Sequence, residues 1–124
     1  MISHSVYKVV HLLGMFMLFT VLGGIALHAV NGGTKQSNIG RRFIAIMHML
    51  ALFVILLGGF GMLARLGLVQ GILPGWVLAK LAIWIVLPVL GTMAYRKPAA
   101  AKLLLVAVPV LGGLAAWIAL YKPF

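Results

Sequence analysis

The sequence contains four long apolar runs, each close to the roughly 20 residues that a helix needs to cross a lipid bilayer. From these runs we predict helices at approximately residues 5–30, 41–67, 75–96 and 99–121. Each run is expected to be helical, because the hydrocarbon offers the backbone no hydrogen-bond partners. The intervening segments are short, so consecutive helices should be antiparallel neighbours. The sequence therefore predicts an all-α, integral membrane four-helix bundle that forms one transmembrane domain, residues 1–124.

The composition supports a membrane location and excludes several classes of function. The chain is 65% hydrophobic with a mean hydropathy of +1.22, whereas a soluble domain is about 45–50% apolar. It contains no Cys, Asp or Glu, so its side chains supply no disulfide, no thiolate metal site and no carboxylate acid/base pair. Its 10 Lys and Arg fall mostly at the ends of the apolar runs and form no patch with interleaved aromatic residues. We therefore expect the lipid bilayer, and no nucleic acid, as a partner.

The basic residues are divided unequally between the two ends of the predicted bundle. Loops 31–42 and 96–102 hold six of them: Lys35, Arg41, Arg42, Arg96, Lys97 and Lys102. The opposite side holds three: Lys8, Arg65 and Lys122. Cytoplasmic loops of membrane proteins carry the excess of Lys and Arg. This bias predicts a multi-pass protein of a bacterial-type inner membrane, with both loops cytoplasmic and both termini outside.

Four ionisable side chains lie within the apolar runs, where desolvation is costly and a functional role is the default hypothesis. His11 and Lys80 enter from the outer side to similar depth, so they are expected to meet. His28 follows His11 by 17 residues, roughly 25 Å along a helix axis, and belongs with His48 to the cytoplasmic level. Those two histidines could face each other. The structural alternative is that each histidine only hydrogen-bonds a neighbouring backbone or lies at headgroup level.

Aromatic residues and glycines accompany these groups at helical spacing. Trp76 and Trp84 lie one turn before and one turn after Lys80, whose ammonium could snorkel, contact their rings or bind an anion such as a porphyrin propionate. Gly59 follows His48 by 11 residues, so it should share that face but lie near the level of His11. Gly91 has the same relation to Lys80, at the other level. Such glycine faces allow either close helix packing or a cleft of porphyrin size.

Imidazoles on facing helices can hold haem iron without help from carboxylates or thiolates. We therefore predict a haem b site. Its candidate iron ligands are His11 and His48, its candidate catalytic group is Lys80, and its other candidate cofactor-binding residues are His28, Trp76, Trp84 and Gly59. A copper site using Met15, Met47 and Met49 is less favoured, because consecutive residues point in different directions on a helix.

Four short motifs resemble the HemJ family of small membrane protoporphyrinogen oxidases. They are Lys8-Val9-Val10-His11, Arg41-Arg42-Phe43, Trp76-Val77-Leu78-Ala79-Lys80-Leu81 and Lys122-Pro123-Phe124. Together they span nearly the whole chain. The resemblance implies haem b with His11 as axial ligand, Lys80 as an essential lysine, and oxidation of protoporphyrinogen to protoporphyrin. It also implies a porphyrin or quinone-type electron partner on the way to the respiratory chain.

The sequence departs from the HemJ pattern in two places. It lacks the Asn-Glu pair at the start of the fourth helix, and the Arg and Tyr expected near His28. A haem-binding relative with another electron partner is therefore an alternative.

The absence of acidic residues favours a second hypothesis from another class. A chain with net charge +10 would attract an acidic or lipid-phosphate partner. The protein could therefore be a non-catalytic small subunit or assembly factor of a larger membrane complex, or a homo-oligomer. An ion-coupled transporter is less favoured, since four helices without a carboxylate offer few sites for a coupling ion.

Overall fold

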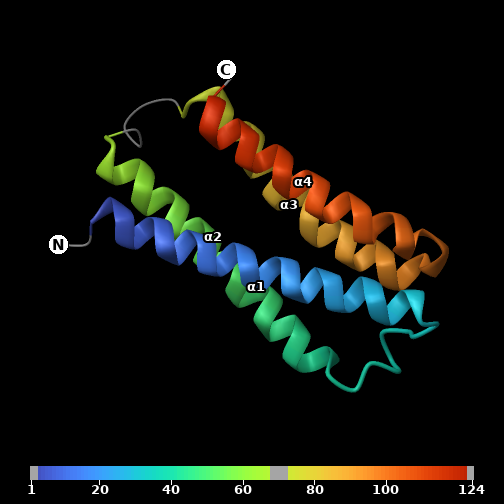
Figure 1. The fold of residues 1–124 in the computed structure, drawn as a ribbon. Coiled ribbons are helices and arrows are strands. Elements are labelled where there is room, and N and C mark those ends of the chain that lie inside the picture. Colours follow the sequence, from blue (N-terminus) through green and yellow to red (C-terminus); the bar gives the residue numbers. More distant parts are fainter. Residues whose placement is uncertain (1–2, 68–72, 123–124) are drawn as a thin grey trace.

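The computed structural model describes residues 3–67 and 73–122, and it is built of long helices (Figure 1). These are α1 (His4–Val30), α2 (Arg41–Arg65), α3 (Gly75–Arg96) and α4 (Ala101–Tyr121), with a short 3₁₀ turn, η1 (Pro98–Ala100), before α4. All four helices are long and apolar enough to cross a membrane. The described residues include no strand. The predicted all-α membrane bundle is therefore confirmed.

The first two helices begin and end at local signals. The Ser3 hydroxyl accepts a hydrogen bond from the Val6 N–H at 3.3 Å and caps α1, which therefore begins at His4. Gly67 has a φ of +73°, a left-handed conformation that terminates a helix. For this reason α2 ends at Arg65, two residues before the predicted end.

The last helix begins two residues later than predicted. Lys97 precedes Pro98, and a residue before proline is driven away from the helical region. Lys97 accordingly has φ −129° and ψ 77°, which ends α3 at Arg96. The segment 98–100 forms η1, and α4 starts only at Ala101.

Helix α1 is the central element of the bundle. It forms an antiparallel hairpin with α2 and also packs against both α3 and α4, which lie side by side (Figure 1). Helices α2 and α3 follow each other in the chain, yet within the described residues they do not pack closely together. Between them runs a seam, which the indole N–H of Trp84 bridges by donating to the Leu52 carbonyl at 3.2 Å.

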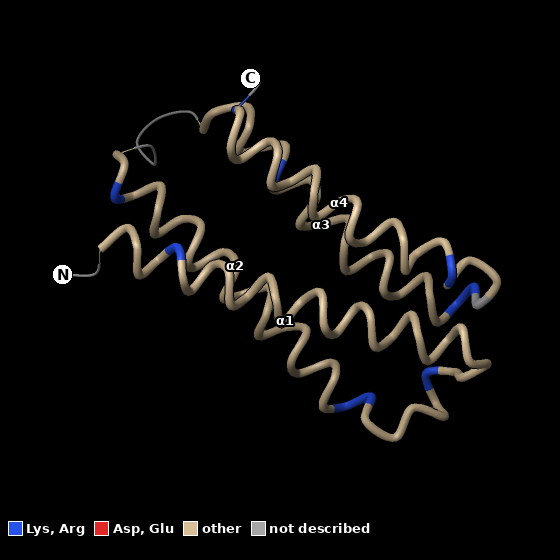
Figure 2. The backbone as a smooth tube through the Cα atoms, in the orientation of Figure 1, with Lys and Arg blue, Asp and Glu red and all other residues tan. Residues whose placement is uncertain are grey.

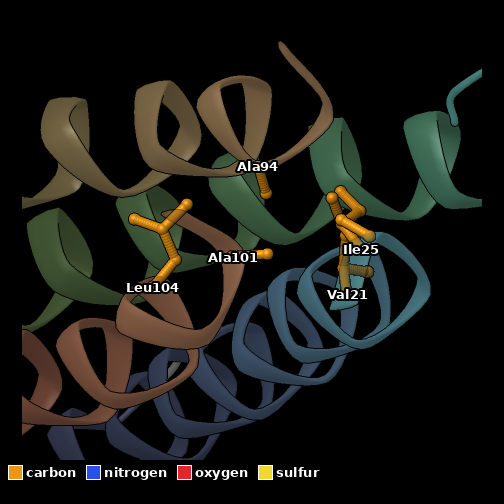
Figure 3. Packing of buried hydrophobic residues seen from close by; sticks show 6 residues of the cluster. Val21, Ile25, Ala94, Ala101 and Leu104 are labelled. Atoms are coloured by element: carbon orange, nitrogen blue, oxygen red, sulfur yellow. The ribbon is translucent and has the colours of Figure 1, made fainter. Parts of the chain in front are cut away.

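The core lies along α1 and consists of small and branched apolar side chains. One cluster comprises Val21, Ile25, Ala29, Ala94, Ala101 and Leu104, most of which are shown in Figure 3. A second, nearer the middle of the bundle, comprises Leu18, Leu22, Ala51, Leu87 and Val108. Because lipid is as apolar as the core, helix association depends on close packing. The alanines of α3 and α4 allow that close approach to α1.

The two ends of the bundle carry most of the charge. Figure 2 shows Lys and Arg gathered near the termini at one end and near segments 31–40 and 97–100 at the other. Both termini lie at the same end of the bundle (Figure 1). This arrangement is what an even number of antiparallel spans requires.

Candidate functional site

His11 is attached to α2 by a hydrogen bond that defines the chemistry of its ring. Its Nδ1 lies 2.8 Å from the Ile55 carbonyl oxygen. A carbonyl can only accept, so Nδ1 carries the hydrogen and donates it. In the neutral ring, Nε2 then holds the free lone pair. A histidine that binds a metal through one nitrogen usually donates the other N–H to a carbonyl or carboxylate in this way.

Glycines of α2 make room for His11. A Cβ at Gly58 would overlap the backbone of His11, and one at Gly59 would lie 3.4 Å from its imidazole. A Cβ at Gly61 would likewise overlap the Tyr7 ring, and a Cβ at Gly14 on α1 would overlap Ile55 on α2. The prediction that Gly59 lies at the level of His11 is confirmed. These glycines serve close packing of α1 on α2, which is the structural alternative foreseen for them.

The ammonium of Lys80 is close enough to the His11 imidazole for a coulombic interaction. A second ammonium, that of Lys122, acts on Lys80 from the end of α4. The half of the bundle that holds the described ends of α1 and α4, His4 and Tyr121, thus contains one imidazole and two cations. No direct hydrogen bond joins any two of these three groups in the described part of the chain.

The two tryptophans flanking Lys80 contact other partners. The ring of Trp76 holds the ammonium of Lys122, with Nζ 5.2 Å from the ring centroid. The indole of Trp84 binds α2 through the Leu52 carbonyl. Neither cation–π contact imagined for Lys80 is formed. Trp76 instead contacts the residue that follows α4, and Trp84 contacts α2.

His28 is engaged in the loop that follows α1. Its Nε2 lies 2.8 Å from the Thr34 carbonyl oxygen and 3.2 Å from the Ser37 hydroxyl. Gly33 packs against the same ring, where any side chain would collide with it. Because Nε2–H donates to the loop, His28 shapes residues 31–40. It is not among the residues that line the cleft at His48.

His48 lines a cleft of about 220 Å³. This cleft lies in the α2–α3 seam, with Ile25 of α1 at its base. The other lining residues are Lys35, Arg41, Ile44, Ala45, Gly91, Thr92, Tyr95 and Arg96. The Nε2 of His48 is buried and has no hydrogen-bond partner among the described residues. The prediction that Gly91 shares the level of His48 is confirmed.

The two histidines that were predicted as iron ligands belong to separate sites. Gly59 contacts the imidazole of His11, and His48 lies 11 residues earlier on α2, which corresponds to about 16 Å. One iron therefore cannot be bound by both. Within residues 3–67 and 73–122, no three His, Cys, Asp or Glu side chains gather to hold a bare ion.

Sequence reasoning did not identify the polar lining of the cleft. Arg41, Ile44, Ala45 and His48 recur at the spacing of one helix face, which was a usable signal for α2. Thr92, Tyr95 and Arg96 form the facing stripe on α3. Their meeting depends on the open α2–α3 seam, which consecutive antiparallel helices would not be expected to leave.

The sequence matches no protein-family model, and no curated protein or solved structure is significantly similar to it. Functional inference therefore rests on the arrangement of the residues described above.

Proposed function

We propose that the protein is a haem b-binding oxidoreductase of the membrane, resembling the HemJ-type protoporphyrinogen oxidases. His11 is the proposed axial ligand. The observation that carries this proposal is the hydrogen bond from His11 Nδ1 to the Ile55 carbonyl, which directs the free lone pair to Nε2. When bound, haem would supply one-electron redox chemistry.

The remaining residues of the outer end support this assignment by their charge. Propionates are anions, and the described chain offers Lys80 near His11 as a cation, with Lys122 near Lys80 as a second one. The chain has no Asp or Glu to compete for these ammoniums. Lys80 would hold a propionate or an anionic substrate beside the ring. Gly59 would keep the imidazole accessible on the side of α2.

An absorbance spectrum of the full chain, expressed with haem supplied and purified in mild detergent, tests the proposal. We expect a Soret band that disappears in His11→Ala and survives in His48→Ala, because the second histidine lies at the other level. Lys80→Gln should retain less haem than Lys80→Arg, which keeps the positive charge. His4→Ala is a control for loss of an imidazole elsewhere on α1.

Two results would contradict the assignment. A Soret band that survives His11→Ala but is lost in His48→Ala would place the iron at the other end of the bundle. A colourless protein that comigrates with a larger complex on a blue-native gel would favour the non-catalytic subunit or assembly factor instead.

We also infer that the protein lies in a bacterial-type inner membrane with both termini outside. The supporting observation is the imbalance of six basic residues against three between the two ends (Figure 2).

A further inference from the structure

The cleft around His48 has a polar mouth and an apolar base. Three cations, Lys35, Arg41 and Arg96, line it at the end of the bundle where helices meet loops. Ile25, Ile44, Ala45 and Gly91 supply its apolar surface. The gradient runs along the membrane normal, from charged at the helix ends to apolar within the span.

The cations of the cleft lack a counter-ion in the chain. There is no Asp or Glu in the sequence. Arg41 uses one nitrogen, Nη1, to donate to the loop carbonyls of Gln36 at 3.2 Å and Asn38 at 3.5 Å, which leaves further guanidinium N–H groups free. The side chains of Lys35 and Arg96 make no hydrogen bond with the described residues. These three residues are exposed and no side-chain carboxylate of the chain neutralises them, so their charge is available to an anion from outside.

Two further groups can donate to such an anion or to the polar atoms near it. The Tyr95 hydroxyl accepts a hydrogen bond from the Asn38 amide at 2.8 Å, so its own hydrogen remains free to donate. His48 lies seven residues after Arg41, about 10 Å along α2. Side chains of a helix lean toward its N-terminus, so the imidazole of His48 leans back toward Arg41. Its unpartnered Nε2 lies below the level of the cations.

We propose that this cleft binds one anionic phospholipid, with its phosphate on Lys35, Arg41 and Arg96. The ester region lies against His48, whose Nε2–H donates to an ester carbonyl oxygen. The acyl chains leave through the α2–α3 seam, where these two helices do not pack closely together. Basic pockets between membrane helices bind anionic headgroups in this way. A free phosphate would satisfy the cations but would leave the apolar base and the buried Nε2 without partners. This inference does not depend on haem binding at His11.

Native mass spectrometry of the full chain in mild detergent tests the proposal, using dioleoylphosphatidylglycerol and dioleoylphosphatidylcholine as probes. We expect one phosphatidylglycerol to be retained per chain in preference to phosphatidylcholine, whose phosphate already has an internal cation. Arg41→Gln and Arg96→Gln should each lower retention by roughly tenfold, because each removes charge-assisted hydrogen bonds to the phosphate.

The sequence provides a matched control for each variant. Arg42 and Lys97 are the immediate neighbours of Arg41 and Arg96, carry the same charge and do not line the cleft. Arg42→Gln and Lys97→Gln should therefore lower retention by no more than about twofold, through the general surface potential. His48→Phe keeps the ring volume but removes the donor, and it should weaken retention while leaving the preference for phosphatidylglycerol intact.

Three outcomes would overturn the proposal. Equal losses in all four charge variants would mean that only overall charge matters. Equal retention of phosphatidylcholine would mean that only the apolar seam binds lipid. Displacement of phosphatidylglycerol by millimolar inorganic phosphate would mean that the cleft binds a free anion. Loss of the Soret band in His11→Ala, in contrast, would leave this lipid test unaffected.

Discussion

The histidines of this protein differ in the backbone groups to which they hydrogen-bond. His11 and His28 each donate one ring N–H to a carbonyl, yet His11 donates across to α2 and His28 donates to its own loop. The first arrangement frees a nitrogen between two helices, and the second stabilises a turn. His48 has no partner for its buried Nε2 and is therefore the imidazole most in need of a ligand. The same residue type thus serves three purposes in one bundle.

Close backbone contact at Gly58 gives a prediction about stability. A methyl group at this position would overlap the backbone of His11, so Gly58→Ala must push α1 and α2 apart. We expect a loss of roughly 1–3 kcal/mol in the free energy of unfolding. Unfolding in detergent, followed by tryptophan fluorescence, would measure it.

Two glycines serve as controls for Gly58→Ala. The adjacent Gly59→Ala meets His11 only at 3.4 Å, and Gly24→Ala meets no atom within 4 Å. Both substitutions should change stability little. Equal losses in Gly24→Ala and Gly58→Ala would show that the α1–α2 contact is not the cause.

Among the helices, α1 carries most of the packing and α2 buries the fewest of its residues. Helix α1 contributes to both core clusters and contacts every other helix. Helix α2 packs closely on α1 and meets α3 across a seam bridged by Trp84. An open seam between consecutive helices leaves space for the cleft at His48. The packing of α1 therefore holds the bundle together, and the seam provides the binding surface.

The bridge across the seam can be tested with Trp84→Phe. This change keeps an aromatic ring but removes the N–H that donates to the Leu52 carbonyl at 3.2 Å. We expect a loss of about 1 kcal/mol in unfolding free energy, together with a wider α2–α3 distance distribution in spin-label measurements. Trp117→Phe is the control, because Trp117 is 46% exposed and its ring lies beside that of Tyr121 on the same helix. An unchanged distance distribution in Trp84→Phe would contradict the role of this hydrogen bond.

The whole molecule is a cationic bundle with its charge divided between two ends (Figure 2). The end that holds segments 31–40 and 97–100 carries more Lys and Arg than the end that holds the termini. The proposed lipid cleft opens at the first end and the proposed haem ligand lies toward the second. Membrane orientation therefore decides which side of the bilayer each site faces.

The absence of native cysteine permits a direct test of orientation. Ser5→Cys lies near the start of α1, and Gln36→Cys lies in the exposed segment 31–40. We expect an impermeant maleimide to label Ser5→Cys in intact spheroplasts and to label Gln36→Cys only after permeabilisation. The reverse pattern would overturn the inferred topology.

The fold was largely predictable because its determinants are local and one-dimensional. Hydrophobic length defines a membrane span, and Gly67 and Pro98 end or delay helices through their own backbone preferences. Depth along a helix follows from residue number alone. This is why Gly59 could be placed beside His11, and Gly91 beside His48, before the structure was known.

The arrangement of helix faces was decided only by tertiary packing. In a soluble helix the polar face distinguishes solvent from core, but here lipid and core are equally apolar and the sequence carries little information about which face is buried. The engagement of His28 with its loop, the pairing of Trp76 with Lys122 and the open α2–α3 seam therefore could not be read from the sequence. Each depends on side chains that are distant in the chain and meet only once α1 occupies the centre of the bundle.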